Sequence, residues 1–368
     1  MTYCINPNCP KRRNPDDLRH CQECGTPLLI PDPLLLQDRY RLLEPLSDFN
    51  EQRYTETFKT EDLIDDQYPV KVIKVLRDPV MLDVFQEHAR MLQELQKLKH
   101  PGIPRVEVDG YFIFSPKNEP EGLRCLVMEH IEGLNLKEWL AEHKRISQEL
   151  ALDWLKQMTE ILEQLHQHRI FHRDIKPSNI MLRQGKELDG QLVLIDFATA
   201  RVMTDSYLIK MSGSRGDTTT VISSGYTSLE QINGRAVPQS DFYSMGRTFV
   251  HLMTGMHPND FPEDGTGKLL WHEKAPQISE WLADFIDDLM AILVSRRPLN
   301  TQEILRRLET NPAVAAENAH FRQLFALLVV INIGLCIALL STLWLWWRQN
   351  SLPAQETSGQ IGNVSNHT

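Results

Sequence analysis

A polar octapeptide near the middle of the chain, residues 172–179, constrains the fold more than any other stretch. It reads His-Arg-Asp-Ile-Lys-Pro-Ser-Asn and follows a long amphipathic helical pattern and a short apolar step. Asp196-Phe197 comes 17 residues after Asn179, at the end of the apolar run 192–195. A lone His-Arg-Asp triplet arises often by chance, whereas these eight residues followed by Asp-Phe form a specific signal. A loop of merely solvated charges is therefore the weaker interpretation.

These two motifs resemble the catalytic loop and the metal-binding loop of the protein kinase fold. Phosphoryl transfer needs positioning and charge neutralisation from the protein more than covalent chemistry. The resemblance implies that Asp174 accepts the proton of a substrate hydroxyl and that Lys176 reaches the transferring phosphate. It also implies that Asn179 and Asp196 hold Mg²⁺, or Mn²⁺, against the phosphates of ATP. Kinases that act on serine and threonine commonly carry a lysine at the place of Lys176, so the resemblance favours such protein substrates.

The resemblance spans residues 40–308 and implies an α+β fold with a small lobe and an all-helical large lobe. The chain length allows a kinase domain of roughly 250–280 residues plus additions. A net charge of −10 argues against a general nucleic-acid partner. We expect a zinc ribbon over 1–30, a linker over 31–39, the kinase domain over 40–310, a juxtamembrane linker over 311–322, a transmembrane helix over 323–347 and a short extracytoplasmic tail over 348–368.

Four of the six cysteines lie at the N-terminus: Cys4, Cys9, Cys21 and Cys24. Two cysteine pairs joined by a polar loop are typical of a tetrahedral Zn²⁺ site, and four thiolate ligands leave no open position for catalysis. So short a segment buries little, and metal binding would supply folding free energy on the order of 10 kcal/mol. Disulfides or free thiols are the alternatives. The polar opening of the chain shows no export signal, so we expect a reducing compartment, which disfavours disulfides.

The small lobe begins with three strand patterns, 40–46, 54–60 and 70–76. The stretch 47–53 occupies the place of the glycine-rich loop that covers the phosphates in kinases, yet it contains no glycine. This departure predicts weaker ATP binding. In the third strand, Lys74 matches the lysine that binds the ATP phosphates. Lys71 lies three residues away, so we expect it on the opposite face and pointing outward.

A helix pattern over 80–99 occupies the place of the small-lobe helix whose glutamate pairs with that lysine. The family reads Phe-x-x-Glu-Ala, whereas residues 85–89 read Phe-Gln-Glu-His-Ala, so that His88 replaces the glutamate. Glu87 lies about 100° round the helix from that position and cannot simply substitute. Three alternatives follow: a more open pocket, another acid that reaches Lys74, or a lysine without a fixed partner.

The stretch 128–133 corresponds to the hinge between the lobes. The resemblance implies that backbone groups of Glu129 and Ile131 bind adenine. Met128 fits a gatekeeper of the nucleotide pocket and a plain core residue equally well.

Several residues of the large lobe match structural positions of the family. Ser223 replaces the threonine whose hydroxyl bonds the catalytic aspartate and lysine. Asp241 matches the aspartate that braces the backbone of the catalytic loop. Glu230 is expected to pair with a buried arginine, Arg297.

The expected activation segment covers residues 199–227 and is rich in serine and threonine. Arg173 could receive a phosphate on one of these hydroxyls. The candidates are Ser212, Ser214 and Thr218 to Thr220. Ala198 replaces the glycine that usually follows Asp-Phe, which predicts altered loop flexibility rather than a lost metal site.

The stretch 323–347 runs 25 residues without a charge. At about 1.5 Å per residue it exceeds a hydrocarbon core of ~30 Å, so a transmembrane helix is expected to tilt. Three tryptophans near its end, Trp344, Trp346 and Trp347, form an aromatic belt. A modest excess of arginine before the span, together with the need for ATP, predicts a cytoplasmic kinase domain and an extracytoplasmic C-terminus in the cell membrane. A buried helix of a soluble protein is the weaker interpretation.

The chain as a whole resembles bacterial serine/threonine kinases of the eukaryotic type, including those with a four-cysteine N-terminus. We expect a membrane-anchored kinase that transfers the γ-phosphate of ATP to protein hydroxyls, with self-association and autophosphorylation as open alternatives. A pseudokinase scaffold is the main competing function, because the small lobe lacks its glycines and its helix glutamate. An adaptor, in which the kinase domain only positions the cysteine module for a partner, is the third.

Overall fold

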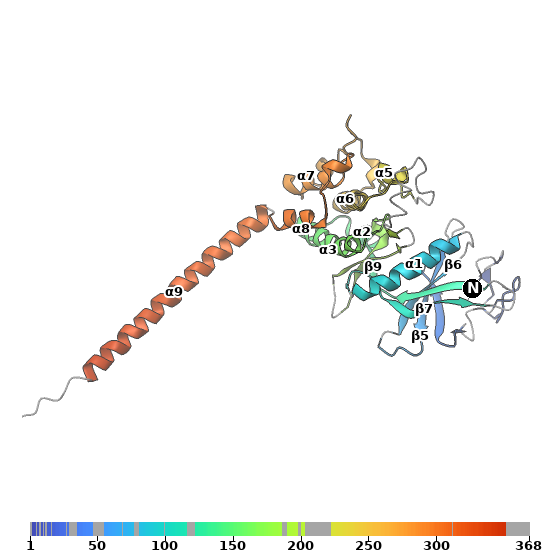
Figure 1. Ribbon diagram of the computed structural model, residues 1–368, viewed down its shortest axis with the longest axis horizontal. Coiled ribbons are helices and arrows are strands. Elements are labelled where there is room, and N and C mark those ends of the chain that lie inside the picture. Colours follow the sequence, from blue (N-terminus) through green and yellow to red (C-terminus); the bar gives the residue numbers. More distant parts are fainter. Residues whose placement is uncertain are drawn as a thin grey trace, which may run out of the picture. The chain divides into compact units, whose positions relative to one another are not determined.

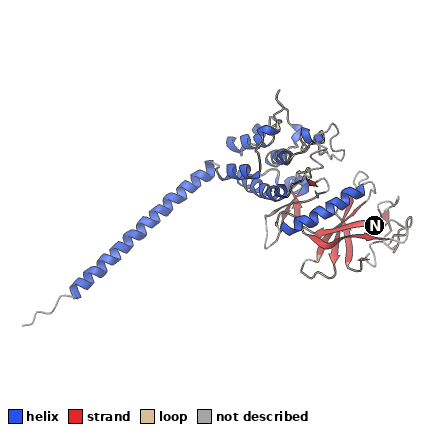
Figure 2. Ribbon diagram, viewed as in Figure 1, coloured by secondary structure: helices blue, strands red, loops and turns tan. Residues whose placement is uncertain are grey.

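The computed structural model describes residues 2–350, except 5, 7, 8, 10, 12, 16, 27, 29–34, 47–54, 68, 77–80, 99, 116–121, 186–189, 198–199, 203–221 and 311. Contacts divide the chain into two units, Met1–Leu308 and Glu309–Thr368. Within the first unit, strands gather in one part and helices in the other (Figure 2). This two-lobed α+β architecture agrees with the predicted fold class.

The small lobe is built on a six-stranded antiparallel sheet with the order β3-β4-β5-β6-β8-β7. Its strands are β3 (Leu35–Leu36), β4 (Tyr40–Pro45), β5 (Thr55–Asp62), β6 (Val70–Leu76), β7 (Val106–Phe114) and β8 (Leu123–Glu129). The helix α1 (Leu82–Leu95), continued by the 3₁₀ turn η2 (Gln96–Leu98), packs beside β7 (Figure 1). The three predicted strands and the predicted helix are therefore present, with ends shifted by a few residues. Part of the predicted linker over 31–39 forms β3 and extends the sheet.

Alternation along β6 places successive side chains on opposite faces of the sheet. Val72 and Leu76 pack into the core that includes α1, and Lys74 alternates to the same face. Ile73 and Val75 belong to a second cluster on the other face. Strand periodicity therefore directs Lys74, as predicted, toward the side on which the helix lies.

Lys71 lies on that second face but does not point outward, so this prediction is wrong. Its side chain is only 5% exposed, and its Nζ lies 2.7 Å from both Asp65 Oδ2 and Glu107 Oε1. Arg39 binds the neighbouring Asp62 at 2.6 Å and lies 3.6 Å from Glu107. The lysine is buried because carboxylates from β7 and from the β5–β6 turn fold over it and neutralise its charge.

Helices dominate the large lobe. They are α2 (Leu136–His143), α3 (Gln148–Gln167), α5 (Leu229–Ile232), α6 (Pro238–Thr254), α7 (Glu280–Leu289) and α8 (Thr301–Glu309). The hydroxyl of Ser147 accepts a hydrogen bond from the Leu150 N–H at 3.2 Å and so caps the N-terminus of α3. α3 and α6 send apolar side chains into one core, among them Trp154 and Met158 of α3 and Phe242, Met245 and Phe249 of α6.

The prediction of an all-helical large lobe is wrong in part, because short strands lie around the polar motifs. β9 (Gly133–Asn135), β11 (Ile180–Arg183) and β12 (Leu192–Leu194) form one small sheet, and β10 (Ile170–Phe171) pairs with β13 (Arg201–Val202). β11 begins where the 3₁₀ turn η3 (Pro177–Asn179) ends, and β12 ends just before the predicted metal-binding loop. The N–H of Ile195 donates to the carbonyl of Asn179 at 2.8 Å. This pairing brings the two motifs together.

The N-terminal segment carries two short strands, β1 (Thr2–Tyr3) and β2 (Arg13–Asn14), which pair antiparallel. Cys4 forms an isolated bridge with Leu28. Leu28 and three of the cysteines make a small buried cluster of their own. The segment therefore buries few apolar side chains of its own, as its length predicts.

The second unit contains the helix α9 (Pro312–Asn350). Residues 312–322, predicted as a linker, belong to this helix. Within α9, Ile331–Arg348 is long and apolar enough to cross a membrane, by length and composition. The predicted tail beyond residue 350 lies outside the described residues, as does the stretch 47–53.

Candidate active site

Three side chains converge on the carboxylate of Asp174, in the loop before β11. Lys176 Nζ lies 2.8 Å from Asp174 Oδ2, and Asn179 Nδ2 donates to the same oxygen at 2.9 Å. Ser223 Oγ donates to Asp174 Oδ1 at 2.6 Å and accepts from Lys176 Nζ at 2.8 Å. The structure thus brings together the three residues that the sequence predicts for phosphoryl transfer, and it contains the predicted contacts of Ser223 with Asp174 and Lys176.

The backbone of this loop is anchored by Asp241, near the start of α6. Its fully buried carboxylate accepts hydrogen bonds from the N–H groups of His172 at 2.9 Å and Arg173 at 2.8 Å. His166 Nε2 lies 3.0 Å from the same carboxylate. Arg173 has a φ of 70°, a left-handed conformation that is unfavourable for a residue with a side chain. The bracing contact predicted for Asp241 is present, and it stabilises a strained turn.

His172 connects this loop to the segment that carries Asp196. Its Nε2 lies 3.1 Å from the carbonyl oxygen of Ile195, and its Nδ1 lies 3.3 Å from the nitrogen of Asp174. Burial lowers the pKa of His172, so the ring is neutral near pH 7. The Nε2–H therefore donates to Ile195, and Nδ1 accepts from the Asp174 N–H. The sequence motif contains this histidine but does not reveal that it joins the two motifs.

Lys74 and Asp196 form an ion pair, with 2.7 Å between Nζ and Oδ1. The Lys74 side chain is 10% exposed, whereas that of Asp196 is 42% exposed. The Lys74 ammonium holds the pKa of Asp196 well below its usual range. Asp196 has a φ of 65°, so its backbone is also in the left-handed region. The second predicted motif is therefore joined directly to the small lobe.

His88 occupies the inward face of α1 and is 3% exposed. Glu87, the neighbouring acid, is exposed and lies 3.6 Å from Arg90. Of the three alternatives for Lys74, the structure shows the second: another acid, Asp196, reaches it. Ala198, expected to alter this loop, lies outside the described residues.

The predicted hinge is anchored through the side chain of Glu129. Its carboxylate accepts from Arg183 Nη1 at 2.7 Å and from the Arg105 N–H at 3.0 Å. Met128 and Ile131 are buried, and Met128 belongs to the core that both lobes share. Adenine binding by the backbone of Glu129 and Ile131 stays a prediction.

The predicted pair of Glu230 and Arg297 is present and buried. Arg297 Nη1 lies 2.7 Å from Glu230 Oε1, and Nη2 lies 3.1 Å from Oε2. Ser240 Oγ donates to the same carboxylate at 2.6 Å. The Arg297 side chain is 1% exposed. Two parallel hydrogen bonds from a buried guanidinium fix α5 to the segment before α8.

Two further contacts of this region were missed by sequence reasoning. Gln231 Nε2 donates to the carbonyl of Arg173 at 2.6 Å, so α5 also supports the catalytic loop. Tyr226 and His251 lie 2.6 Å apart between hydroxyl and Nδ1, and the ring of His257 packs edge-on against Tyr226. A glutamine or histidine at these places carries no sequence signal by itself. The proposed phosphorylation sites, Ser212, Ser214 and Thr218 to Thr220, lie outside the described residues.

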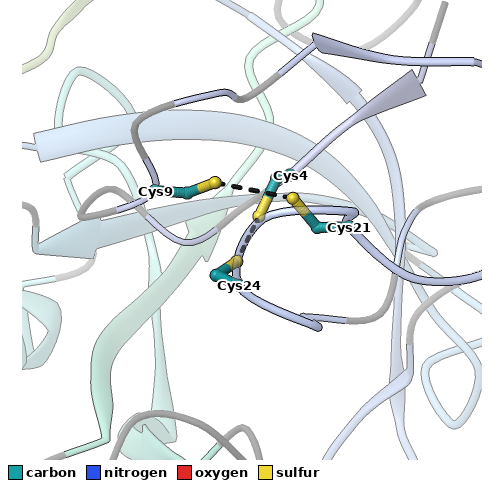
Figure 3. A group of neighbouring side chains, drawn as sticks. All are labelled: Cys4, Cys9, Cys21 and Cys24. Carbon is teal, nitrogen blue, oxygen red and sulfur yellow. Dashed lines mark hydrogen bonds between the residues drawn. The ribbon is translucent and has the colours of Figure 1, made fainter.

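The sulfur atoms of Cys4, Cys9, Cys21 and Cys24 point toward one another (Figure 3). Cys4 and Cys24 are 3.4 Å apart between sulfurs, and Cys9 and Cys21 are 3.5 Å apart. All four sulfurs lie within 4.8 Å of one another. The six cysteines all lie in described parts of the chain, and none of them forms a disulfide. The sulfur nearest to each cysteine of the first pair, Cys4 and Cys9, therefore belongs to the second pair, Cys21 and Cys24. The loop between the two pairs brings them together, as the zinc prediction requires.

The chemistry of this cysteine cluster fits a divalent metal. Burial raises the pKa of Cys4 far above its ordinary value, and the nearby Cys24 raises it further. Burial would also raise the pKa of Cys21, yet hydrogen bonds from the backbone of Cys24 and Glu23 lower it to about 7. Four thiolates so close together would repel one another, and a bound cation removes that repulsion.

The described residues contain two further acidic groupings that could suggest a metal. Asp62, Asp65 and Glu107 surround Lys71 and Arg39. The other grouping is His272, Asp284 and Asp287, and Lys268 Nζ lies 2.8 Å from Asp287 there. Because lysine or arginine already neutralises each of them, neither carries a metal assignment.

Comparison with known proteins agrees with this geometry. The family model described as protein kinase domain matches residues 59–307. Serine/threonine-protein kinase B of Synechocystis sp. is 31% identical over 320 residues, which cover 84% of this chain and 52% of that protein. Serine/threonine-protein kinase C of the same organism is 37% identical over 69% of this chain and 46% of its own length. Serine/threonine-protein kinase PknA of Nostoc sp. is 32% identical over 75% of this chain and 48% of its own length.

This chain therefore spans about half the length of these curated relatives. The matched family region includes the loop around Asp174, the ion pair of Lys74 and Asp196, and all but the first strands of the small lobe. Motifs, two-lobed fold and family match agree, and the chain belongs to the protein kinase family.

Proposed function

We propose that this chain is a membrane-anchored serine/threonine kinase that transfers the γ-phosphate of ATP to protein hydroxyls. One observation carries the proposal: the Asp174 carboxylate lies within hydrogen-bond distance of Lys176, Asn179 and Ser223. A carboxylate at this place can accept the proton of an incoming hydroxyl, and the adjacent ammonium can stabilise charge on the transferring phosphate. The similarity to bacterial serine/threonine-protein kinases supports the choice of acceptor.

Asn179 and Asp196 are proposed to hold Mg²⁺ or Mn²⁺. Their amide and carboxylate oxygens suit these hard cations, and their segments meet through the hydrogen bond between Ile195 and Asn179. When bound, the metal would neutralise charge on the ATP phosphates. Lys74 would contact the same phosphates, and the backbone of Glu129 and Ile131 would bind adenine.

Label transfer from Mg-ATP tests this function in the full-length chain in detergent. We expect phosphate on the chain itself or on a generic serine- and threonine-rich protein, and none with Asp174→Asn. Serine and threonine should carry the label rather than tyrosine.

A pseudokinase scaffold is the second candidate, and the contact between Lys74 and Asp196 favours it. In that contact the phosphate-binding lysine and the metal ligand neutralise each other. No label in either protein, together with no shift of the unfolding temperature on adding Mg-ATP, would establish the scaffold instead.

The N-terminal residues 1–30 are proposed to form a structural zinc ribbon. Metal analysis should find about one zinc per chain, because four thiolates complete one tetrahedral site. Cys21→Ser should lower this content to nearly zero. Cys125→Ser is the matched control, since Cys125 is buried in the small-lobe sheet. Equal zinc in both variants would contradict the assignment.

The apolar part of α9 is proposed to anchor the chain in the cell membrane, with the kinase domain of 40–310 in the cytoplasm and residues 348–368 outside. The length of Ile331–Arg348 and the aromatic residues near its end support this proposal. In sealed vesicles, an added protease should reach either a C-terminal epitope tag or the kinase domain but not both, because the two lie on opposite sides of the membrane. Release of the chain from membranes by alkaline carbonate would contradict the anchor.

A further inference from the structure

The segment 223–227, here called the Ser223 turn, carries a hydroxyl into the candidate active site. Ser223 Oγ lies 2.6 Å from Asp174 Oδ1 and 2.8 Å from Lys176 Nζ. The turn closes on itself, because the Ser223 N–H donates to Thr227 Oγ1 at 2.8 Å and the Thr227 N–H donates to the Ser223 carbonyl at 3.2 Å. These local bonds fix the shape of the turn, whereas its position relative to Asp174 depends on contacts outside it.

Tyr226 joins the Ser223 turn to helix α6. Its side chain is buried, and its hydroxyl oxygen lies 2.6 Å from Nδ1 of His251. Its carbonyl accepts a hydrogen bond from Ser244 Oγ, also on α6, at 2.9 Å. Burial lowers the pKa of His251 to about 4 and raises the pKa of Tyr226, so both groups are neutral near pH 7. The contact is therefore a directional hydrogen bond that adds no charge to the site.

The segment after α6 supports the Ser223 turn as well. Asn259 Nδ2 donates to Ser224 Oγ at 2.6 Å. Gly225 has a φ of 85°, and a Cβ on it would lie 2.8 Å from Cε1 of His257, so the turn and this segment are in close contact. The ring of His257 also packs against that of Tyr226, with 5.2 Å between the ring centres. Closely packed groups transmit displacements, so the turn follows any shift of the residues that support it.

Helix α6 supports the catalytic loop at its other end. The carboxylate of Asp241 binds the N–H groups of His172 and Arg173. His251 lies about three turns further along the same helix, at a distance of about 15 Å for a rise of 1.5 Å per residue. One helix therefore holds both the loop that carries Asp174 and the turn that carries Ser223.

We propose that His251 is a positioning residue for the acceptor side of the active site, because it holds the Ser223 turn in place through the hydroxyl of Tyr226. Helix α6 then fixes the distance between the catalytic loop and the turn, so that Asp174 and Lys176 can share the Ser223 hydroxyl. This role rests on the proposed function as a kinase. His251 acts through Tyr226 and not on the reacting atoms.

The consequence should be confined to the acceptor side. Lys74 and Asp196, proposed for the ATP phosphates and the metal, belong to other segments, β6 and the residues after β12. A loosened Ser223 turn should therefore impair the use of a protein acceptor and leave the KM for Mg-ATP unchanged. General destabilisation of the domain would impair both.

The first test compares two variants of similar shape in label transfer from Mg-ATP to dephosphorylated casein by the full-length chain in detergent. His251→Leu places a methyl group near the position of Nδ1 and should lower kcat/KM for casein about tenfold. His251→Asn places an amide oxygen or nitrogen there and should restore kcat/KM to within about threefold of the unmodified chain. In both variants the KM for Mg-ATP should stay within about twofold of its original value.

His168→Leu is the control for this test, because His168 is exposed at the end of α3 and contacts the Gln164 carbonyl of its own helix. It should leave the kinetics with casein unchanged. Equal losses with His251→Leu and His251→Asn would overturn the proposal. A rise of the KM for Mg-ATP as large as the loss with casein would also overturn it.

Tyr226→Phe removes the same hydrogen bond from the other side and keeps the buried ring, so it also covers the case in which a substitution of His251 disturbs folding. It should lower kcat/KM for casein as much as His251→Leu does. The double variant should lose no more than either single variant, because the two changes remove one shared contact. Losses that add would contradict the proposed role.

Hydrogen exchange followed by mass spectrometry tests the positioning without phosphate transfer. In the free full-length chain, the amides of the Ser223 turn should exchange about tenfold faster with His251→Leu than with His251→Asn, while those of α3 keep their rates. Equal exchange in the two variants would overturn the proposal, whether or not the chain transfers phosphate. The expected difference in exchange, with no label transfer by the unmodified chain, would refute the kinase function alone and leave the positioning of the turn established.

Discussion

The two lobes differ in how they hold their site residues. In the large lobe, Asp174 contacts three other site side chains, and Asp241 and Gln231 bind the backbone of the same loop. In the small lobe, Lys74 contacts the rest of the site, as far as the chain is described, through a single ion pair with Asp196. The large lobe thus holds its site residues by several hydrogen bonds, whereas the small lobe holds Lys74 through one ion pair.

This difference agrees with the sequence departures. The large-lobe positions match the family residue by residue apart from two small replacements, Ser223 and Ala198, whereas the small lobe lacks the glycines and the helix glutamate. The groups proposed to position the acceptor hydroxyl lie in the large lobe, whereas the lysine proposed to bind the ATP phosphates lies in the small lobe. The comparison therefore predicts a chain that can arrange the chemistry but binds metal and nucleotide less readily.

The largest expected effect concerns the large-lobe anchor. Arg297→Met should reduce the free energy of unfolding by about 3–5 kcal/mol, because it leaves the Glu230 carboxylate without its buried partner. Urea titration followed by tryptophan fluorescence measures this loss. Arg307→Met is the control, since that arginine is partly exposed beside Asp288 and should change stability by less than about 1 kcal/mol. If Arg297→Met and Arg307→Met reduced the free energy of unfolding by similar amounts, the buried pair of Glu230 and Arg297 would contribute no more than an exposed ion pair.

A smaller effect is expected from the charge network of the small lobe. Lys71→Met should reduce the free energy of unfolding by about 2 kcal/mol, because it leaves Asp65 and Glu107 without a shared cation. Both carboxylates keep some contact with water, which limits the loss. Lys97→Met, at a side chain that is 70% exposed, is the matched control with almost no change. If Lys71→Met reduced the free energy of unfolding as much as Arg297→Met, the charge network of the small lobe would stabilise the chain as much as the anchor of the large lobe.

The smallest expected effect is on the pH dependence of stability, which should differ between a group of the large lobe and a group of the small lobe. Burial and the neighbouring His257 lower the pKa of His251 to about 4, so protonation favours the unfolded chain. Asp260 opposes this effect and Lys137 adds to it. Stability from this site is complete above the unfolded pKa of about 6.5 and falls as the pH drops from there toward 4.

Asp62 in the small lobe also loses its contribution as the pH falls, but in a more acidic range. Burial would raise its pKa, but Arg39 prevails and lowers it, so its contribution is lost only in acid below about 4. Unfolding midpoints at pH 7.5 and pH 5.0 should therefore differ less in His251→Gln than in the unmodified chain. An unchanged difference would show that His251 is not the group that titrates.

Local patterns predicted much of this molecule. Strand alternation separated Lys74 from Lys71, helix periodicity located α1, and the motif around residues 172–179 indicated the contacts of Asp174. The pair of Glu230 and Arg297 was also predicted, because each stands inside a recognisable local pattern. The strand and helix features follow a regular period, whereas the pair of Glu230 and Arg297, 67 residues apart, was implied by the family resemblance.

By itself, the sequence determined the fold class, the order of the two lobes and the identity of the groups around Asp174, since periodicity and short motifs carry that information. Only the tertiary structure decided that Asp196 is the acid beside Lys74, and that Lys71 is buried between carboxylates. It also decided which cysteine sulfurs are nearest neighbours. The physical reason is that a buried charge takes whichever counter-charge the packing brings within a few ångströms, and that partner can lie far away in the sequence.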